Sequence, residues 1–334
     1  MTRKYQVVGI GNAMVDVLCH VDDAFLEANG VQKGIMQLIG LERAAELYDR
    51  MGPAREVSGG SAANTIAGIA ALGGRTAYVG KVRDDQLGRI FAHDMRAQGA
   101  DYLTPFAPAD SAEETGRCMV LVTPDGERSM NTYLGVSEFL FPEDIVPEEM
   151  AAAEWLYLEG YRFDGPECQE AFWKAMAAAR AAGGKVSLTL SDPFCVNRHR
   201  DAFADIIDEH VDLLFCNEHE LAAMYPAPTL QASLDIAASH AETVVCTASE
   251  RGAYVARGAD RFHVDAVPAR VVDATGAGDL FAAGFLWGLT NGHGLEDCAR
   301  MGCVAAAEVI GHIGARPETD LRALLREHGL GVGG

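Results

Sequence analysis

Short apolar runs alternate along the chain with longer segments whose apolar residues repeat at helical spacing. The short runs predict strands over residues 5–10, 76–80, 155–158, 186–190, 213–216 and 243–246. The longer segments predict helices over residues 41–51, 61–72, 87–98, 168–182, 201–209, 230–241, 279–289 and 295–310. Because strands that alternate with helices form βαβ units, we expect an α/β fold around a central, mostly parallel sheet.

Two predicted β-hairpins interrupt this alternation. Residues 117–122 and 128–133 are strand-like and flank a turn that contains Pro124 and Gly126. Residues 253–256 and 261–264 form the second pair. The first hairpin lies among α/β elements, so we expect it to belong to an appended sheet. Residues 16–38 have a mixed pattern that favours neither helix nor strand.

Composition and charge narrow the class of protein. The 334 residues are 49% hydrophobic and 22% charged, as is usual for a globular protein. A net charge of −21 argues against nucleic-acid binding, which requires basic surfaces. The eight cysteines form no C-x-x-C pair, which argues against a zinc or redox centre. With no apolar leader and no membrane-length apolar run, we expect a cytoplasmic protein that binds no membrane.

The most specific chemical signal is a glycine-rich turn that leads into an apolar helix. Gly276, Ala277 and Gly278 are small enough for backbone amides to converge on an anion, and a helix N-terminus adds partial positive charge. Asp279 lies in the first turn of that helix. A carboxylate repels a bound phosphate but can hold a hydroxyl group that attacks one. The turn therefore indicates phosphoryl transfer to an alcohol, with Asp279 as the base.

Two motifs carry a resemblance to a known family. Residues 273–279 (DATGAGD) resemble the second signature of the PfkB, or ribokinase-like, family of carbohydrate and nucleoside kinases, with Ala274 in place of the usual threonine. Residues 58–65 (SGGSAANT), followed by a small apolar helix and two glycines, resemble its first signature. The two motifs occur in the family's order, and the resemblance covers almost the whole chain.

The resemblance implies a particular architecture. We expect one ribokinase-like domain over residues 1–334, with three layers around the central sheet. A small β-sheet lid would be inserted in the α/β body, formed by about residues 14–39 and 104–137. Sugar kinases of the family often pair through their lids, whereas its adenosine kinases are typically monomeric. We expect a monomer or a weak homodimer here.

The resemblance also places an ATP and Mg²⁺ site. Asn217 and Glu220 match the family motif N-x-x-E, which acts at the Mg²⁺ and phosphate site partly through water, as suits a hard cation. They follow a predicted strand, and ligands bind at the carboxyl ends of strands in open sheets. Thr247 and Gly252 match an ATP-side loop that here lacks its first glycine, and Gly278 would also contact ATP. The chain has neither a Walker A motif nor an H-R-D catalytic loop.

Two further implications concern the cation and the acceptor. The family's monovalent cation site would place K⁺ near Asp273 and Ala315. Asp16 matches the family aspartate that binds sugar hydroxyls, since one carboxylate can accept hydrogen bonds from two of them. The polyol site would be completed by Asn12, Gly60 and Asn64.

Three local features resemble the adenosine kinases of this family. They are residues 11–17, Gln37 at the position of a lid glutamine near the base, and residues 190–194 in place of a motif common in sugar kinases. An apolar slot for a purine would then be lined by Met14, Leu134, Val136 and Phe194.

The leading hypothesis is an ATP-dependent kinase that phosphorylates the 5′-hydroxyl of a nucleoside, with adenosine preferred. The same motifs allow a sugar kinase for fructose, ribose or 2-keto-3-deoxygluconate, in which the four slot residues belong to the core. A third reading is a nucleoside sensor without turnover, against which the intact Asp279 argues. A dinucleotide oxidoreductase is disfavoured because Met14 interrupts the G-x-G-x-x-G fingerprint.

Overall fold

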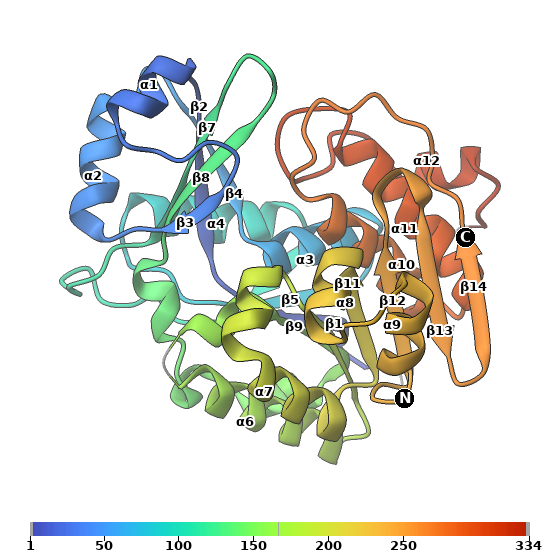
Figure 1. The fold of residues 1–334 in the computed structure, drawn as a ribbon. Helices are drawn as coiled ribbons and strands as arrows, with labels where there is room; N and C mark the ends of the chain where they lie inside the picture. Colours follow the sequence, from blue (N-terminus) through green and yellow to red (C-terminus); the bar gives the residue numbers. More distant parts are fainter. Residues whose placement is uncertain (1–2, 166, 332–334) are drawn as a thin grey trace.

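A nine-stranded sheet forms the centre of the computed structural model, which describes residues 3–165 and 167–331 (Figure 1). Its order is β14-β13-β12-β11-β10-β9-β1-β5-β6, parallel from β12 to β6, with β13 and β14 antiparallel at one edge. The strands are β1 Tyr5–Ile10, β5 Thr76–Val79, β6 Ala100–Tyr102, β9 Ala153–Glu159, β10 Lys185–Thr189, β11 Leu213–Asn217, β12 Thr243–Thr247, β13 Ala253–Arg257 and β14 Asp260–Val264.

Helices cover both faces of this sheet, because successive strand residues point to opposite sides and both sides are apolar. In β9, Trp155 and Tyr157 pack into one core and Leu156 and Leu158 into the other. One face is covered by α3 Ser61–Ala71, α4 Gln86–Ala97, α10 Ala277–Thr290, α11 Leu295–Val309 and α12 Leu321–Glu327. The other face is covered by α5 Pro147–Ala151, α6 Cys168–Ala181, α7 Pro193–His210, α8 Glu218–Met224 and α9 Leu230–Ala237. The predicted three-layer α/β fold is confirmed.

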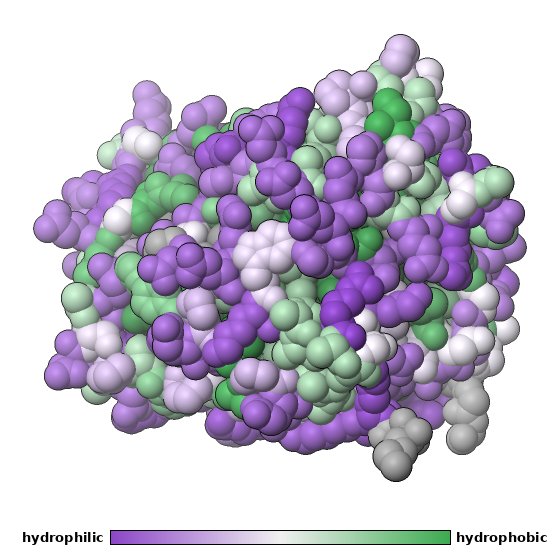
Figure 2. All heavy atoms as spheres, turned by 90° about the horizontal axis from the view of Figure 1, so that it is seen from below, coloured by the Kyte–Doolittle hydropathy of each residue, from purple (hydrophilic) through white to green (hydrophobic). Residues whose placement is uncertain are grey.

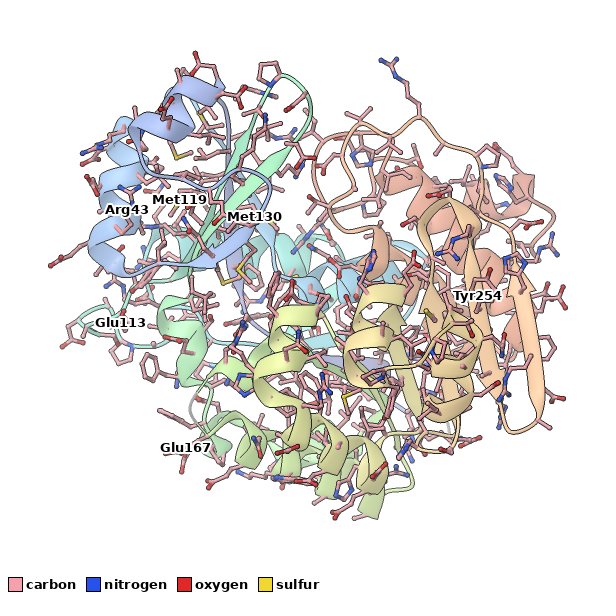
Figure 3. The ribbon with its side chains drawn as sticks, in the orientation of Figure 1. Arg43, Glu113, Met119, Met130, Glu167 and Tyr254 are labelled. Atoms are coloured by element: carbon pink, nitrogen blue, oxygen red, sulfur yellow. The ribbon has the colours of Figure 1, made fainter. Side chains whose placement is uncertain are left out.

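A second, five-stranded sheet stands beside the body, with the order β3-β8-β7-β2-β4 (Figure 1, upper left). One of its faces packs on α1 Asp23–Ala28 and α2 Leu41–Arg50 around a small core that includes Leu47 and Met119. Figure 3 labels Met119 and Met130 on this sheet, far from Tyr254 on β13. The strands are β2 Met14–His20, β3 Met36–Leu38, β4 Arg55–Gly59, β7 Gly116–Val122 and β8 Arg128–Tyr133.

Several elements differ from the sequence prediction. The helix expected over 201–209 begins at Pro193, because the Asp192 side chain accepts hydrogen bonds from the amides of Phe194 and Cys195 at 2.6 and 3.2 Å. A kink at His199 (φ −125°) breaks the helical periodicity, which hid the first half. The pattern also missed β2 and β4, which belong to the small sheet and mix buried with partly exposed residues. Both predicted hairpins are present, as β7–β8 and β13–β14.

Hydrophilic side chains cover much of the face seen in Figure 2, with apolar ones in scattered groups between them. This surface suits a chain with a net charge of −21. Among the described residues, no helix combines the length and the apolar character that crossing a membrane requires.

Candidate active site

Two helix N-termini meet where the carboxyl end of the central sheet faces the small sheet. They belong to α3 and α10, and their first turns are joined through Asp279. Ser61 Oγ donates to Asp279 Oδ1 at 2.6 Å, and Asn64 Nδ2 donates to Oδ2 at 3.0 Å. Burial raises the pKa of Asp279, and these two hydrogen bonds oppose the rise. The carboxylate predicted to be the base is therefore held rigidly by the first signature.

The glycine-rich turn before α10 has two glycines with different physical roles. Gly276 is in the left-handed region (φ 80°), and a Cβ there would lie 2.7 Å from the Cβ of Ala315. A Cβ on Gly278 would meet only open space. The fold requires the first glycine, whereas the second leaves the helix end accessible.

Backbone amides at this helix end are free to bind an anion. The first intrahelical bond joins the Leu280 amide to the Gly276 carbonyl at 2.8 Å, so the amides of Gly278 and Asp279 precede the helical ladder. The Ala277 amide instead donates to the Ala274 carbonyl at 3.3 Å. Within the part of the chain that the structure describes, the amides of Gly278 and Asp279 donate to no carbonyl, whereas that of Ala277 is shared with the turn.

Asp16 lies on β2, and its carboxylate contacts the backbone of Gly59, where any Cβ would collide with it. Burial raises the pKa of Asp16 to about 7, while the nearby charges of Arg316 and Arg128 lower it. Arg316 is buried, and its Nε donates to Asn64 Oδ1 at 3.4 Å. Its Nη1 has no hydrogen-bond partner among the described residues. Arg316, which the sequence did not suggest, thus lies near the carboxylate of Asp16 and is linked to that of Asp279 through Asn64.

Asn12 and Gly60 lie together at the turn after β1. Gly60 adopts φ 89°, and a Cβ there would collide with the Asn12 carbonyl. The Asn12 side-chain oxygen accepts from Arg162 Nη1 at 3.2 Å, so that oxygen already has a protein donor. Glu159, at the end of β9, accepts from the amides of Asn12 and Ala62 at 3.2 and 2.8 Å. Its buried carboxyl has a pKa raised to about 7, and it fixes this turn against α3.

The residues expected to form a purine slot are only partly together. Met14 is buried, and a Cβ on Gly116 would touch both its sulfur, at 2.7 Å, and the Leu134 carbonyl, at 2.5 Å. Val136 is buried in the same segment. Phe194 is 65% exposed at the start of α7, so its ring does not close the slot in this structure.

Gln37 belongs to the small sheet. Its Nε2 donates to Asn131 Oδ1 at 2.6 Å, across the paired strands β3 and β8. The side-chain nitrogen is therefore engaged within the sheet rather than pointing freely toward the body.

Asn217 and Glu220 form a closed hydrogen-bonded pair at the start of α8. The Asn217 side-chain oxygen accepts from the amides of His219 and Glu220 at 2.9 Å each, and Glu220 accepts from the Asn217 amide at 2.9 Å and its Nδ2 at 2.6 Å. Burial, together with the charges of Asp192 and Asp279, raises the pKa of Glu220 to about 7. Glu220, Asp192 and Asp279 are acidic and offer oxygen ligands, which are the ligands that Mg²⁺ prefers.

The expected ATP-side residues lie next to this pair. Thr247 ends β12 directly opposite Asn217 of β11. Gly252 follows a single helical turn, Ser249–Arg251, with φ 80°, and a Cβ there would collide with the Val264 carbonyl. The sheet therefore brings the two predicted ATP motifs to the same edge.

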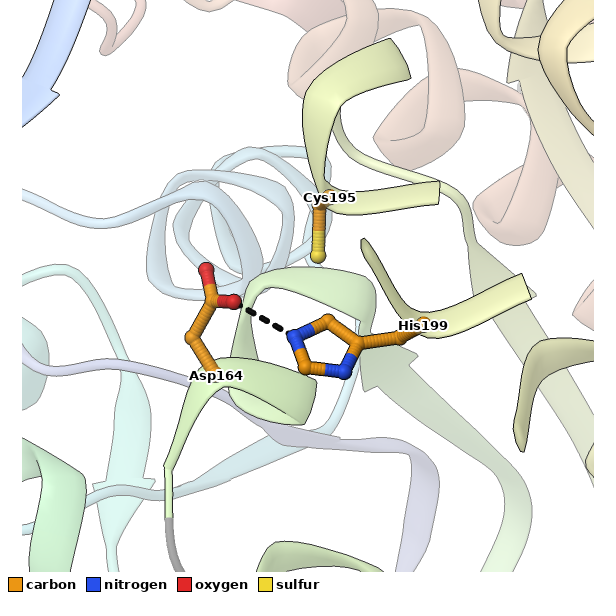
Figure 4. Close-up of side chains that lie close together, drawn as sticks. All are labelled: Asp164, Cys195 and His199. Atoms are coloured by element: carbon orange, nitrogen blue, oxygen red, sulfur yellow. Dashed lines mark hydrogen bonds and ion pairs between the residues drawn. The ribbon is translucent and has the colours of Figure 1, made fainter. Parts of the chain in front are cut away.

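A separate cluster of Asp164, Cys195 and His199 has the residue types of a metal centre (Figure 4). His199 Nε2 lies 2.6 Å from Asp164 Oδ1, and Arg198 binds both Asp164 oxygens at 3.1 and 2.6 Å. The buried Cys195 thiol donates to the Gly160 carbonyl at 3.3 Å. A guanidinium that occupies both carboxylate oxygens repels a metal ion, so this cluster is an ion-pair network that ties α7 to the segment after β9.

The chain is similar to several known kinases. Adenosine kinase from Sinorhizobium meliloti is 48% identical, with a TM-score of 0.92 over 97% of this chain and 99% of that one. A probable sugar kinase from Rhizobium etli is 46% identical, with a TM-score of 0.93 over 98% and 99%. A fructokinase from Klebsiella pneumoniae is 29% identical over 75% of this chain and 82% of its own. The model of the pfkB family of carbohydrate kinases matches residues 19–321, and this chain therefore belongs to that family.

Proposed function

We propose that this kinase transfers the γ-phosphoryl group of ATP to the 5′-hydroxyl of a nucleoside, with adenosine preferred. The observation that carries the proposal is the placement of Asp279. Its carboxylate, fixed by Ser61 and Asn64, lies in the same helical turn as the open amides of α10. A base and an anion-binding group thus stand side by side, as in-line transfer to an alcohol requires.

In this proposal Asp279 accepts the proton of the acceptor hydroxyl as its oxygen bonds to the γ-phosphorus. The bond between that phosphorus and the β–γ bridging oxygen breaks, and ADP leaves with the electron pair. The amides of Gly278 and Asp279 face the charge that spreads over the transferring group. Because burial raises the pKa of Asp279, its carboxylate is a stronger base than an exposed aspartate.

Glu220 would hold Mg²⁺ through water, and the capping pair with Asn217 fixes the position of its carboxylate. When bound, Mg²⁺ neutralises charge on the ATP phosphates. Thr247 and Gly252 lie on the same edge of the sheet and would contact the nucleotide.

The acceptor would lie between the small sheet and α3. Asp16 would accept hydrogen bonds from the ribose hydroxyls, and Met14 with Leu134 would pack against the purine. We propose that the small sheet serves as a lid, since it carries Asp16 and Met14 on β2. The similarity to Sinorhizobium meliloti adenosine kinase supports adenosine as the acceptor.

A sugar kinase is the second candidate. The exposed ring of Phe194 leaves the slot without one of its expected walls, and a fructokinase is among the relatives. A small sugar would need hydroxyl partners such as Asp16 but no apolar slot.

ADP release with ATP and Mg²⁺ distinguishes the two candidates. The acceptor panel is adenosine, guanosine, inosine, cytidine, ribose, fructose and 2-keto-3-deoxygluconate. We expect turnover with adenosine to exceed that with every sugar. Turnover with a sugar alone would retain Asp279 as base but assign Met14 and Leu134 to packing. Tight nucleoside binding without turnover would instead indicate a sensor.

A further inference from the structure

Asp273, the first residue of the glycine-rich signature, is fully buried and surrounded by N–H donors. Its Oδ1 accepts from the Thr275 amide at 2.8 Å, and its Oδ2 accepts from the Gly314 amide at 2.8 Å. Arg128 Nη2 forms an ion pair with the same Oδ2. The side chain of Asp273 has no exposed surface, so these neighbours compensate its negative charge in place of water.

The expected K⁺ position near Asp273 and Ala315 does not fit this arrangement. A monovalent metal ion would need oxygen ligands, whereas three of the roughly four lone-pair positions of the Asp273 carboxylate already accept from the Thr275 amide, the Gly314 amide and Arg128. The guanidinium of Arg128 would also repel a second cation at the same carboxylate. The loops that contain Gly276 and Ala315 are also in close contact, because a Cβ on Gly276 would lie 2.7 Å from the Cβ of Ala315.

Arg128 binds the signature loop at a second point. Its Nη1 donates to Thr275 Oγ1 at 2.6 Å, so the guanidinium spans the residues just before Gly276. The side chain comes from β8 of the small sheet and is only 13% exposed. Figure 1 shows the β7–β8 hairpin reaching toward the loop that leads to α10. A planar, permanently charged group with two directed bonds is well suited to fix a loop.

We infer that the Arg128 guanidinium takes the place of a monovalent metal ion at the signature loop, so that phosphoryl transfer by this kinase needs no K⁺. The charge that compensates Asp273 is supplied by the small sheet. Contact between that sheet and the body therefore completes the loop that precedes the α10 amides. The inference rests on membership of the kinase family and not on which acceptor is used.

The test compares initial rates in K⁺ and in tetramethylammonium chloride at equal ionic strength. For the natural protein we expect rates within about twofold of each other, because screening is the same in both salts. In Arg128→Met the loop loses its cation. We therefore expect a low rate in tetramethylammonium and a rate that is about tenfold or more higher in K⁺. Lys33→Met is the matched control, since Lys33 lies in the loop before β3 and, among the described residues, pairs with Asp23 and Asp125; it should behave as the natural protein does.

A second readout does not depend on turnover. K⁺ should raise the melting temperature of Arg128→Met relative to tetramethylammonium, and should leave that of the natural protein unchanged. Strong activation of the natural protein by K⁺ would overturn the inference, and this comparison decides even if the variant fails to fold. A folded Arg128→Met that responds to K⁺ in neither readout would also overturn it, because Arg128 would then not occupy a cation position.

Discussion

At the scale of single residues, the site is a set of charges that only the fold brings together. Arg316 lies near the carboxylate of Asp16 and binds the side chain of Asn64, which in turn binds Asp279. Burial lowers the pKa of Arg316 to about 10, so it remains charged at neutral pH. Its charge partly offsets the cost of burying Asp16. We therefore infer that Arg316 is a positioning residue for the proposed acceptor site.

Replacement of Arg316 should move the pH dependence of acceptor use. In the proposed acceptor site Asp16 accepts two hydroxyl hydrogen bonds only when ionised, so a pKa of about 7 would set the acid limb of kcat/KM for the acceptor. Removing a nearby positive charge raises that pKa, so Arg316→Met should shift the acid limb upward by about one pH unit. Arg316→Lys should restore most of the original profile. An acid limb that stays in place in the methionine variant would contradict this role.

The sequence pointed to the residues that we propose act on substrates, but not to most of the side chains that hold them in place. The signatures contain Asp279 and Ser61, and only the first was singled out. Glu159 and Arg128 contact partners 147 residues away along the chain, at Asn12 and Thr275. A charged residue at a strand end, as at Glu159, is the one local signal that existed. Contacts between residues so far apart in the chain depend on the fold and produce no recognisable motif in the sequence.

At the scale of elements, long periodic helices and buried strands were predictable, because their pattern reflects one continuous apolar face. The β7–β8 hairpin of the small sheet was predicted, whereas its strands β2, β3 and β4 were not, since they are short and their pattern is mixed. β4 in particular begins with exposed residues, Arg55 and Glu56. The start of α7 was missed for another reason. Its capping residue, Asp192, precedes Pro193 and is a helix start signal, but the kink at His199 interrupts the period.

The N-terminus of α10 gives a prediction at this scale. Gly278→Ala should keep or raise the melting temperature, since its Cβ meets open space and alanine favours a helix by roughly 0.5–1 kcal/mol over glycine. Its methyl group would displace a phosphate from the amides, so we expect kcat/KM for ATP to fall by about 10²-fold. Gly276→Ala is the contrasting variant and should lower the melting temperature, because of its φ of 80° and its contact with Ala315. Normal ATP kinetics in Gly278→Ala would show that no phosphate approaches this turn.

At the scale of the whole molecule, three carboxyl groups are buried on different elements: one on β2 of the small sheet, one at the end of β9 and one in the first turn of α8. Asp16, Glu159 and Glu220 each have a pKa raised to about 7, mainly by burial. Their ordinary values are 3.8 for the aspartate and 4.5 for the two glutamates. The folded state therefore binds protons that the unfolded state has already released, and the stability that these groups contribute falls as the pH rises toward about 7.

The ligand-free protein should consequently be more stable at about pH 6 than at about pH 8, with each group contributing up to about 1.4 kcal/mol per pH unit to the free energy of unfolding. Melting curves across this range measure the slope. Glu159→Gln should reduce the slope, whereas the exposed Glu42→Gln should leave it unchanged. A melting temperature that rises steadily from pH 6 to pH 8 would show that these carboxyls are not buried with raised pKa values.

The most direct test of the proposed mechanism is the comparison of Asp279→Asn with the natural protein, by steady-state turnover and by calorimetric binding of adenosine. Asparagine keeps the size of the side chain and can still accept from Ser61, but it cannot take a proton from a hydroxyl. We predict that adenosine binds within about threefold of the natural affinity while kcat falls by about 10³-fold or more. Near-normal kcat in Asp279→Asn would contradict the assignment of Asp279 as the base.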